Sequence, residues 1–200
     1  MTHRILIGGA AALAAVGGLL TLTDTAEATR PAGPASFALD PVHSAVMFEL
    51  THYDVSHAWG RFNTLEGSFT VDTEDLSKSS ISLTVDAESV DTNNEKRDQH
   101  LRSADFFSTK QFPSITFEST AVRPTGEGTM DVVGDLTFLG QTKEVTAQAT
   151  LVGMAETSQG TKAGFNATLV IDRTDFGNDT YTSTIGKDVT LHISVEGNGR

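Results

Sequence analysis

Hydrophobic and polar residues alternate with a period of two over most of the chain after residue 36. In residues 44–50, SAVMFEL, the side chains of Val46, Phe48 and Leu50 share one face. The same alternation recurs in residues 81–90, 115–119, 134–140, 164–173 and 189–196. Period two places successive side chains on opposite faces of a strand. These segments therefore predict antiparallel strands with one buried face and one solvated face.

The breaks between the alternating segments carry Gly, Asn, Asp and Pro, which suit hairpin turns. We count at least eight strand segments, and the sequence shows no long helical pattern and no repeat of fixed period. A sheet with one dry face must pack on a second sheet or close on itself. We therefore predict an all-β fold, either a sandwich or an eight-stranded antiparallel barrel, and such a barrel can hold one ligand.

One segment, residues 92–107 (TNNEKRDQHLRSADFF), departs from the strand pattern. Thr92 followed by Glu95 is a capping-box pattern, which predicts one short helix near residues 94–103. The helix is polar until Leu101, and two phenylalanines follow it directly. We expect the helix to lie outside the barrel or across its mouth, with the aromatic rings pointing into the barrel.

The N-terminal residues 1–28 have the pattern of a secretory signal peptide. Arg4 precedes an apolar run rich in Ala and Gly, and Ala26-Glu27-Ala28 matches a cleavage site. An uncleaved transmembrane anchor is the alternative, because the run of about 18 residues is near the lower limit for a span. We expect cleavage after Ala28, a periplasmic or secreted protein without a stable membrane span, a flexible tether at 29–36 and one domain at 37–200.

Charge and cysteine content exclude several classes of function. The formal net charge is −12, from 26 acidic and 14 basic residues. So acidic a protein repels phosphate backbones, and we expect no nucleic acid partner. The chain has no cysteine, which excludes disulfides, cysteine nucleophiles and cysteine-ligated zinc.

Histidines and charged residues give little support for metal binding or catalysis. His43, His52, His57 and His100 lack the spacing of a zinc site, and we predict no metal. Ser44 follows His43, but adjacent strand residues face apart and cannot pair as nucleophile and base. We therefore predict no enzymatic activity. Arg173, just before a turn, is expected to pair with a carboxylate or a carbonyl.

Five motifs occur in the same order as in a known family. They are DPVHSAVMFELTH, RDQHLRSADFF after the helix start, QFPSITFEST, VVGDLTFLGQTKEV and IDRTDFG. Together they resemble the YceI-like family of exported bacterial proteins, over residues 37 to about 196. The resemblance implies an eight-stranded lipocalin-like barrel. It also implies an apolar tunnel that carries a polyisoprenoid or another amphiphilic molecule, with that lipid as ligand and no cofactor.

By this resemblance, the helix and the segment after it lie at the open end of the barrel. A polyprenyl tail gains roughly 0.8 kcal/mol for each buried methylene, and it needs no hydrogen bonds along its length. Phenylalanine rings supply such apolar walls without donors. The headgroup would stay near the mouth, where polar residues can meet it. The rim or an exposed edge could also support a homodimer.

The inward-facing positions are the candidate tunnel residues. They are Val46, Phe48, Leu50, His52, Phe69, Leu83, Val85, Leu101, Phe106, Phe107, Phe112, Phe117, Leu136, Phe138, Phe165, Leu169, Phe176 and Ile193. Each strand residue could instead fill a solid core, and the three phenylalanines after the helix could form a plug. Two other functions remain open: an accessory to isoprenoid or quinone enzymology, and a surface-acting stress protein with a filled core.

Overall fold

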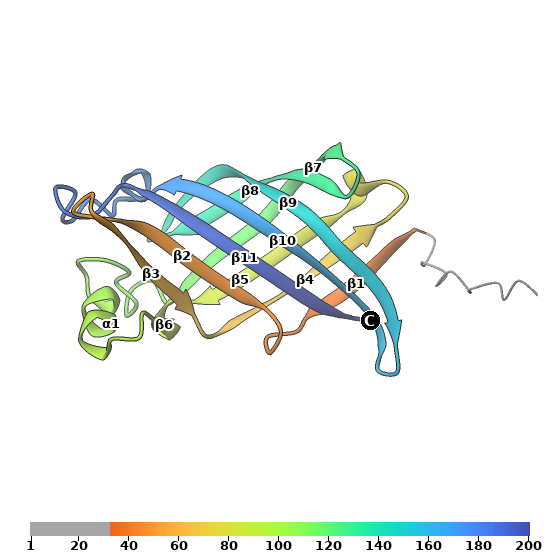
Figure 1. Ribbon diagram of the computed structural model, residues 1–200, viewed down its shortest axis with the longest axis horizontal. Helices are drawn as coiled ribbons and strands as arrows, with labels where there is room; N and C mark the ends of the chain where they lie inside the picture. Colours follow the sequence, from red (N-terminus) through yellow and green to blue (C-terminus); the bar gives the residue numbers. More distant parts are fainter. Residues whose placement is uncertain (1–32) are drawn as a thin grey trace, which may run out of the picture.

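The computed structural model describes residues 33–200 and consists almost entirely of β-strands (Figure 1). The strands are β1 (Pro34–Leu39), β2 (Ala45–His52), β3 (Ser56–Phe62), β4 (Leu65–Asp72), β5 (Ser80–Asp86), β6 (Val90–Asp91), β7 (Ser114–Gly126), β8 (Thr129–Phe138), β9 (Gln141–Thr157), β10 (Gly160–Asp172) and β11 (Asp188–Gly199). The helices are α1 (Glu95–Arg102) and the 3-10 turns η1 (Leu76–Lys78), η2 (Ala87–Ser89) and η3 (Arg173–Phe176).

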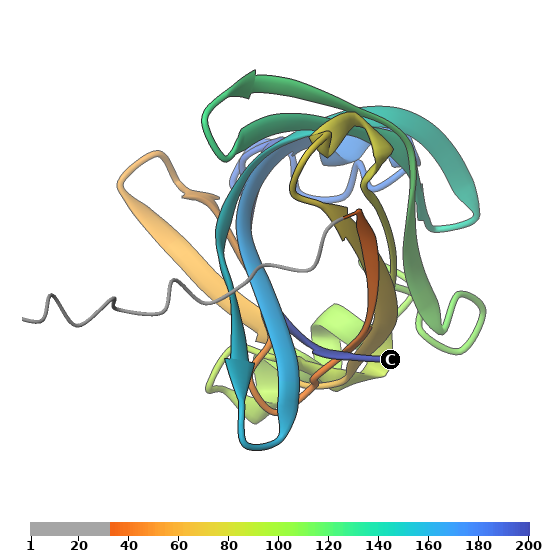
Figure 2. The ribbon, with the colours of Figure 1, turned by 90° about the vertical axis from the view of Figure 1, so that its right-hand side faces the viewer.

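Eight of the strands close into a barrel, which confirms the predicted lipocalin-like architecture over the sandwich. The ring runs β1-β4-β5-β7-β8-β9-β10-β11, and β11 pairs again with β1. All of these pairings are antiparallel. Figure 2 shows the ring from the end at which β1 and the β9–β10 hairpin lie. Closure leaves the ring without an unpaired edge.

The remaining strands widen the barrel at its other end. Both β1 and β2 pair with β11, β1 near the C-terminus of β11 and β2 farther from it. Strand β3 pairs with β2, and the two-residue β6 pairs with the end of β3. Between β1 and β2, the Ser44 hydroxyl donates to the Glu196 carbonyl (3.2 Å) and accepts from the Glu196 amide (3.0 Å). Ser44 thus bridges the sheet at the point where the chain leaves the ring.

The end of the barrel near the C-terminus is packed solid. Phe37 is fully buried and stacks on Phe69 with 5.1 Å between ring centroids. Phe69 in turn meets the edge of Phe165 at 5.3 Å. A Cβ atom on Gly197 would lie 2.5 Å from the Phe69 ring, so only glycine lets this ring fill the barrel. We call this region the packed end.

One sequence-based boundary needs correction. The predicted tether is wrong for residues 34–36, because β1 begins at Pro34 and pairs there with Asp72 of β4. The predicted signal peptide, and residues 29–32 of the tether, lie outside the described residues. Within residues 33–200, no helix has the length and apolar character needed to cross a membrane.

The short helix forms where it was expected, but its N-cap was assigned to the wrong residue. Asn94, not Thr92, caps α1, and its side chain accepts from the Arg97 amide at 3.0 Å. Thr92 instead donates its amide (2.9 Å) and its hydroxyl to the buried carboxylate of Asp98. The reciprocal contact of a capping box is therefore replaced by one that ties the helix to the segment before it.

Candidate ligand-binding cavity

Helix α1 lies at one end of the barrel (Figure 1). A cavity of about 590 Å³ inside the barrel is lined there by Arg97, His100 and Leu101 of α1 and opens at that end. This volume is in the range of small-molecule binding sites. The wall includes fifteen of the predicted tunnel residues: Val46, Phe48, Leu50, His52, Leu83, Val85, Leu101, Phe106, Phe107, Phe117, Leu136, Phe138, Phe165, Leu169 and Ile193. The strand alternation had placed the strand members of this set on one face, and closure of the barrel brings them around one space.

The interior at this end is hollow rather than packed. Phe117, Phe165, Ala167, Leu191 and Ile193 all face the cavity, yet they are only half-buried. Inward-facing residues at the packed end, such as Phe37, are fully covered by neighbouring side chains. A filled core, which the sequence left open, is therefore not what the structure contains.

Three predicted tunnel residues lie elsewhere. Phe69 points inward but belongs to the packed end, where Phe37 covers it. Phe112 is in the loop before β7. Its ring lies against Gly140 of the β8–β9 turn and is not part of the cavity wall. Phe176 is buried in η3 behind Phe138, with 5.8 Å between ring centroids. The prediction that these three line the tunnel is wrong. Alternation shows that Phe69 points inward, but not at which level along the barrel axis it lies. Alternation does not apply to Phe112 in a loop or to Phe176 in a turn.

The two phenylalanines after α1 take different positions. Phe107 enters the barrel, and its ring lies 5.5 Å from that of Phe62, 5.8 Å from Phe138 and 6.3 Å from Phe48. Phe106 stays at the mouth, where it stacks on Tyr181 at 5.8 Å. The segment after the helix thus supplies both an interior wall and part of the mouth.

Polar contacts, rather than apolar packing, hold α1 at the mouth. Arg97 donates from Nε to the Thr92 hydroxyl (2.7 Å) and from Nη2 to the Thr92 carbonyl (2.6 Å). Arg102 donates from Nε to the Glu88 carbonyl (2.7 Å) and from Nη2 to the Val90 carbonyl (2.9 Å). The helix needs little apolar surface for this attachment, which explains its polar sequence. Thr92, Arg97 and His100 remain on the cavity wall as its polar edge.

The buried Arg173 organises the opposite side of the mouth. Its guanidinium donates to the carbonyls of Gly186 (2.9 Å), Asn178 (2.7 Å), Thr180 (3.0 Å) and Ile185 (3.0 Å), and to the Asn178 side chain (2.7 Å). This confirms the expected pairing with carbonyls at the turn. Burial lowers the pKa of the Arg173 guanidinium, and the nearby carboxylates of Asp172 and Asp179 oppose this shift. One side chain thereby fixes the loop between β10 and β11.

Sequence patterns missed several residues of the wall. Ala147, Ala149 and Ala167 face the cavity and leave it room because their side chains are small. Trp59 and Tyr181 also contribute to the wall while reaching the surface. In β3, alternation assigns Ala58 and Phe62 to the inner face and Trp59 to the outer one, so it could not have predicted that Trp59 borders the cavity. The loop that holds Tyr181 has no periodic pattern from which its position could be predicted.

The histidines do not converge on one point. His52, His57 and His100 belong to the cavity wall near the mouth, whereas His43 lies near the packed end. His100 Nε2 lies 2.9 Å from the carboxylate of Asp105, and both side chains are about half exposed. Within residues 33–200, no carboxylate lines the cavity, so the wall offers no carboxylate base to a bound molecule.

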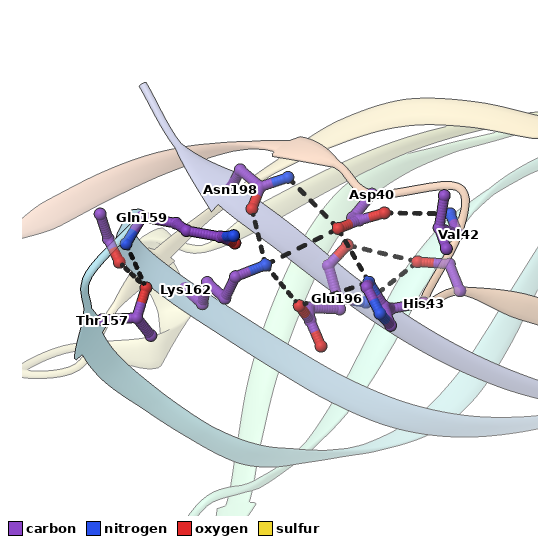
Figure 3. Close-up of polar contacts among 10 residues, drawn as sticks. Asp40, Val42, His43, Thr157, Gln159, Lys162, Glu196 and Asn198 are labelled. Carbon is purple, nitrogen blue, oxygen red and sulfur yellow. Dashed lines mark hydrogen bonds and ion pairs between the residues drawn. The ribbon is translucent and has the colours of Figure 1, made fainter.

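One cluster near the packed end has a donor set that could hold a metal ion (Figure 3). Ligand atoms of Asp40, His43 and Glu196 lie within 4.8 Å of one another. However, Lys162 Nζ lies 2.7 Å from the Glu196 carboxylate and 3.7 Å from that of Asp40. It also donates to the Asn198 side chain at 2.9 Å. The ammonium group supplies the cation that the carboxylates need, and the cluster ties β10 and β11 to the turn after β1.

This cluster also controls the ionisation of its own members. The His43 ring lies 3.0 Å from Asp40 Oδ2, and this hydrogen bond lowers the pKa of Asp40 to about 2. The hydrogen bond with Glu196 raises the pKa of Lys162 above its usual value. Both shifts favour the charged forms, as expected for an ion-pair cluster.

Comparisons with known proteins match both the sequence and the fold. The model of the YceI-like domain family matches residues 37–197. Protein YceI of Escherichia coli O17:K52:H18 (strain UMN026 / ExPEC) is 41% identical over 156 residues, which span 78% of this chain and 81% of the relative.

Two solved structures share the barrel. Burkholderia cenocepacia BcnA aligns with a TM-score of 0.73 at 23% identity, covering 79% of this chain and 98% of BcnA. A polyisoprenoid binding domain from Saccharophagus degradans, implicated in plant cell wall breakdown, aligns with a TM-score of 0.66 at 18% identity, covering 83% and 99% of the two chains. At these identities the structures establish the fold alone. The match to the family model and the 41% identity with protein YceI show that this chain belongs to the YceI-like family.

Proposed function

We propose that this protein is an exported carrier that binds one long isoprenoid-like lipid, or a similar amphiphile, inside the barrel. The observation that carries this proposal is the apolar cavity of about 590 Å³, open at one end and closed at the other by packed phenylalanine rings. Membership of the YceI-like family supports lipid binding, as does the shared fold with a polyisoprenoid binding domain. The protein would act by binding rather than by catalysis.

The chemistry of the wall suits a ligand with a long apolar tail. Such a tail offers no hydrogen bonds, and the deep wall consists of residues such as Leu83, Leu136 and Leu169, which require none. Each buried methylene would contribute roughly 0.8 kcal/mol. A polar headgroup would remain near Arg97 and His100 at the mouth.

Export is the second part of the proposal, and it rests on residues 1–28. Their charged start, apolar run and Ala26-Glu27-Ala28 site favour cleavage and a periplasmic or secreted location. Intact mass measurement on the protein from the periplasmic fraction tests this. A chain beginning at Thr29 supports it, and a full-length chain retained in the cytoplasm contradicts it.

Filling the cavity tests the binding proposal directly. Ala167→Phe places a large ring in the cavity, whereas Thr168→Phe places the same ring on the outer face of the same strand. We expect Ala167→Phe to weaken binding of a radiolabelled polyprenol by about tenfold or more. Thr168→Phe should bind as the unmodified protein does. Equal binding by both variants, with both folded by circular dichroism, would place the ligand outside the cavity.

A further inference from the structure

The aromatic residues with polar atoms are concentrated around the mouth of the cavity. The chain contains one tryptophan and two tyrosines. Tyr53 is in the β2–β3 hairpin, Trp59 in β3 and Tyr181 in the β10–β11 loop, and these elements reach the mouth end of the barrel in Figure 1. Tyr53 is 60% exposed, Trp59 50% and Tyr181 49%, and Val55, at the tip of the β2–β3 hairpin, is 83% exposed. Tyr181 lines the cavity, and Trp59 borders it while its ring stacks on His192 on the outer face of the sheet. The exposed surface is therefore continuous with the binding site through Tyr181. We call these four residues the rim.

Both rim tyrosines are held in a backbone conformation that large side chains rarely adopt. Tyr53 has φ of 53° and Tyr181 has φ of 58°, in the left-handed region. A bulky residue at such an angle is strained, and such strain persists where the surrounding structure enforces it, often at functional sites. Each tyrosine packs one side of its ring, Tyr53 on His52 and Tyr181 on Phe106, and about half of each residue stays exposed.

Hydrogen bonds join the two strained segments into one platform. The Tyr53 amide donates to the Thr184 carbonyl at 2.7 Å, and the Thr184 amide donates to the Tyr181 carbonyl at 2.9 Å. The Gly186 amide donates to the Thr51 carbonyl at 2.9 Å. The hairpin and the β10–β11 loop are therefore fixed relative to each other, and the buried Arg173 anchors that loop from below.

The segments around the mouth are less acidic than the rest of the protein. Residues 52–59, 95–105 and 178–187 hold five carboxylates and four cations. These are Asp54, Glu95, Asp98, Asp105 and Asp179, with Lys96, Arg97, Arg102 and Lys187. Of the net charge of −12, −11 therefore lies on the rest of the chain. Because acidic residues repel headgroup phosphates, the mouth is the end of the protein that meets the least repulsion at a lipid surface.

We propose that the rim docks on the headgroup region of a zwitterionic phospholipid membrane, from which the apolar ligand enters the cavity. This inference rests on the proposed function, because a water-insoluble ligand must be exchanged with a lipid phase. Tyrosine and tryptophan are the residues that favour the membrane–water interface, where an apolar ring and a polar atom are both satisfied. Docking of the rim would align the mouth with the lipid chains.

Vesicle flotation with rim variants tests the docking. Tyr53→Asn/Val55→Asp removes two rim side chains that do not line the cavity, and asparagine tolerates the left-handed backbone. Val152→Asp, at a residue 67% exposed on β9, adds the same charge away from the mouth. We expect the unmodified protein and Val152→Asp to float with phosphatidylcholine vesicles. The double variant should float at least about tenfold less.

Trp59, as the only tryptophan, reports on the same contact. Phosphatidylcholine with brominated chains should quench Trp59 fluorescence in the protein that floats. Quenching without flotation would mean that a lipid enters the cavity without docking, and would overturn the inference. Equal flotation of the double variant would also overturn it. Sedimentation velocity gives a third outcome that would overturn the inference. If the unmodified protein self-associates and the double variant does not, a second copy of the chain covers the rim instead of a membrane.

Delivery of a polyprenol from ethanol, without vesicles, separates this inference from the proposed function. The double variant should bind that polyprenol as the unmodified protein does, while its uptake from vesicles falls. If the unmodified protein binds no polyprenol by either route, the proposed function fails. If it binds from ethanol and never floats with vesicles, only the docking fails.

Discussion

The two ends of the barrel contrast, although the same alternation of apolar and polar residues builds both. At the packed end, Phe37 and Phe69 stack inside the barrel and fill it, and Phe165 meets the edge of Phe69 from the cavity side. At the mouth, the inward residues enclose a cavity instead, and the side chains around it are partly exposed aromatics. An alternating pattern therefore determines which side chains point inward, but not whether they meet.

The difference has two physical causes. At the packed end β1 and β4 belong to the ring, and Gly197 lets the Phe69 ring occupy the axis. Toward the mouth, β2 takes the place of β1 as the partner of β11, β3 extends the sheet beyond β2, and small residues such as Ala147 and Ala167 line the wall. Widening of the sheet and small side chains together leave the space unfilled.

The largest expected effect is on the packed end. Phe37→Ala removes a fully buried ring, and we expect the free energy of unfolding to fall by about 3–5 kcal/mol. Urea denaturation measures this. Phe107→Ala at the mouth should cost clearly less, because that ring faces a cavity and is only half-buried. Equal losses at the two sites would remove the distinction between the ends.

Removal of the Arg173 guanidinium should loosen the mouth. Arg173→Met leaves the carbonyls of Asn178, Thr180 and Ile185 without their donor, and we expect a loss of roughly 2–3 kcal/mol. Hydrogen exchange should rise first in residues 178–186. Arg173→Lys keeps the positive charge but replaces the planar guanidinium, with its several N–H donors, by one ammonium group. Its loss of stability should therefore be smaller than that of Arg173→Met. Uniform acceleration across the barrel would show that Arg173 supports the whole fold rather than the mouth.

A matched pair of phenylalanines distinguishes wall from core. Phe107→Ala should weaken polyprenol binding by about tenfold, because the side chain lines the cavity. Phe176→Ala, behind the wall, should reduce stability and leave the affinity of the folded protein nearly unchanged. Titration with radiolabelled polyprenol gives the affinities, and thermal melts give the stabilities. The reverse order of affinities would contradict the assignment of the wall.

The smallest expected effect concerns the ion-pair cluster at the packed end. The pKa of Asp40 is lowered from 3.8 to about 2 in the folded protein, mainly by the hydrogen bond with His43. A lowered pKa means that the carboxylate stabilises the fold above 3.8 and that this contribution is lost as the pH falls through about 2. Asp40→Asn should therefore melt slightly below the unmodified protein near neutral pH. A difference that persists at pH 2 would exclude ionisation as its cause.

Much of the barrel was predictable because its strands alternate and its turns carry Gly, Asn and Asp. The short helix was predictable from its polar, capped sequence, but the choice between Thr92 and Asn94 as N-cap was not. Both residue types can cap a helix, and the contact of Thr92 with Asp98 decides between them. The first three residues of β1 were missed because a segment rich in Pro, Gly and Ala gives no alternation.

The candidate site was predictable on the strands and poorly predictable in the loops. Phe48 and Ile193 follow from alternation, whereas Phe112 has no register that would place it. Phe69 shows the limit within strands, since its inward direction was right but its height on the barrel was not. Tyr181 was missed because its position depends on hydrogen bonds from Arg173 to the surrounding loop.

Native mass spectrometry of the protein purified from a bacterial periplasm, followed by organic extraction, tests the central claim most directly. We predict a stoichiometric adduct that is released as an isoprenoid or a similar amphiphile, and that is absent from Ala167→Phe. A mass without adduct, unchanged after incubation with polyprenols and quinones, would contradict the claim that the cavity is a lipid site.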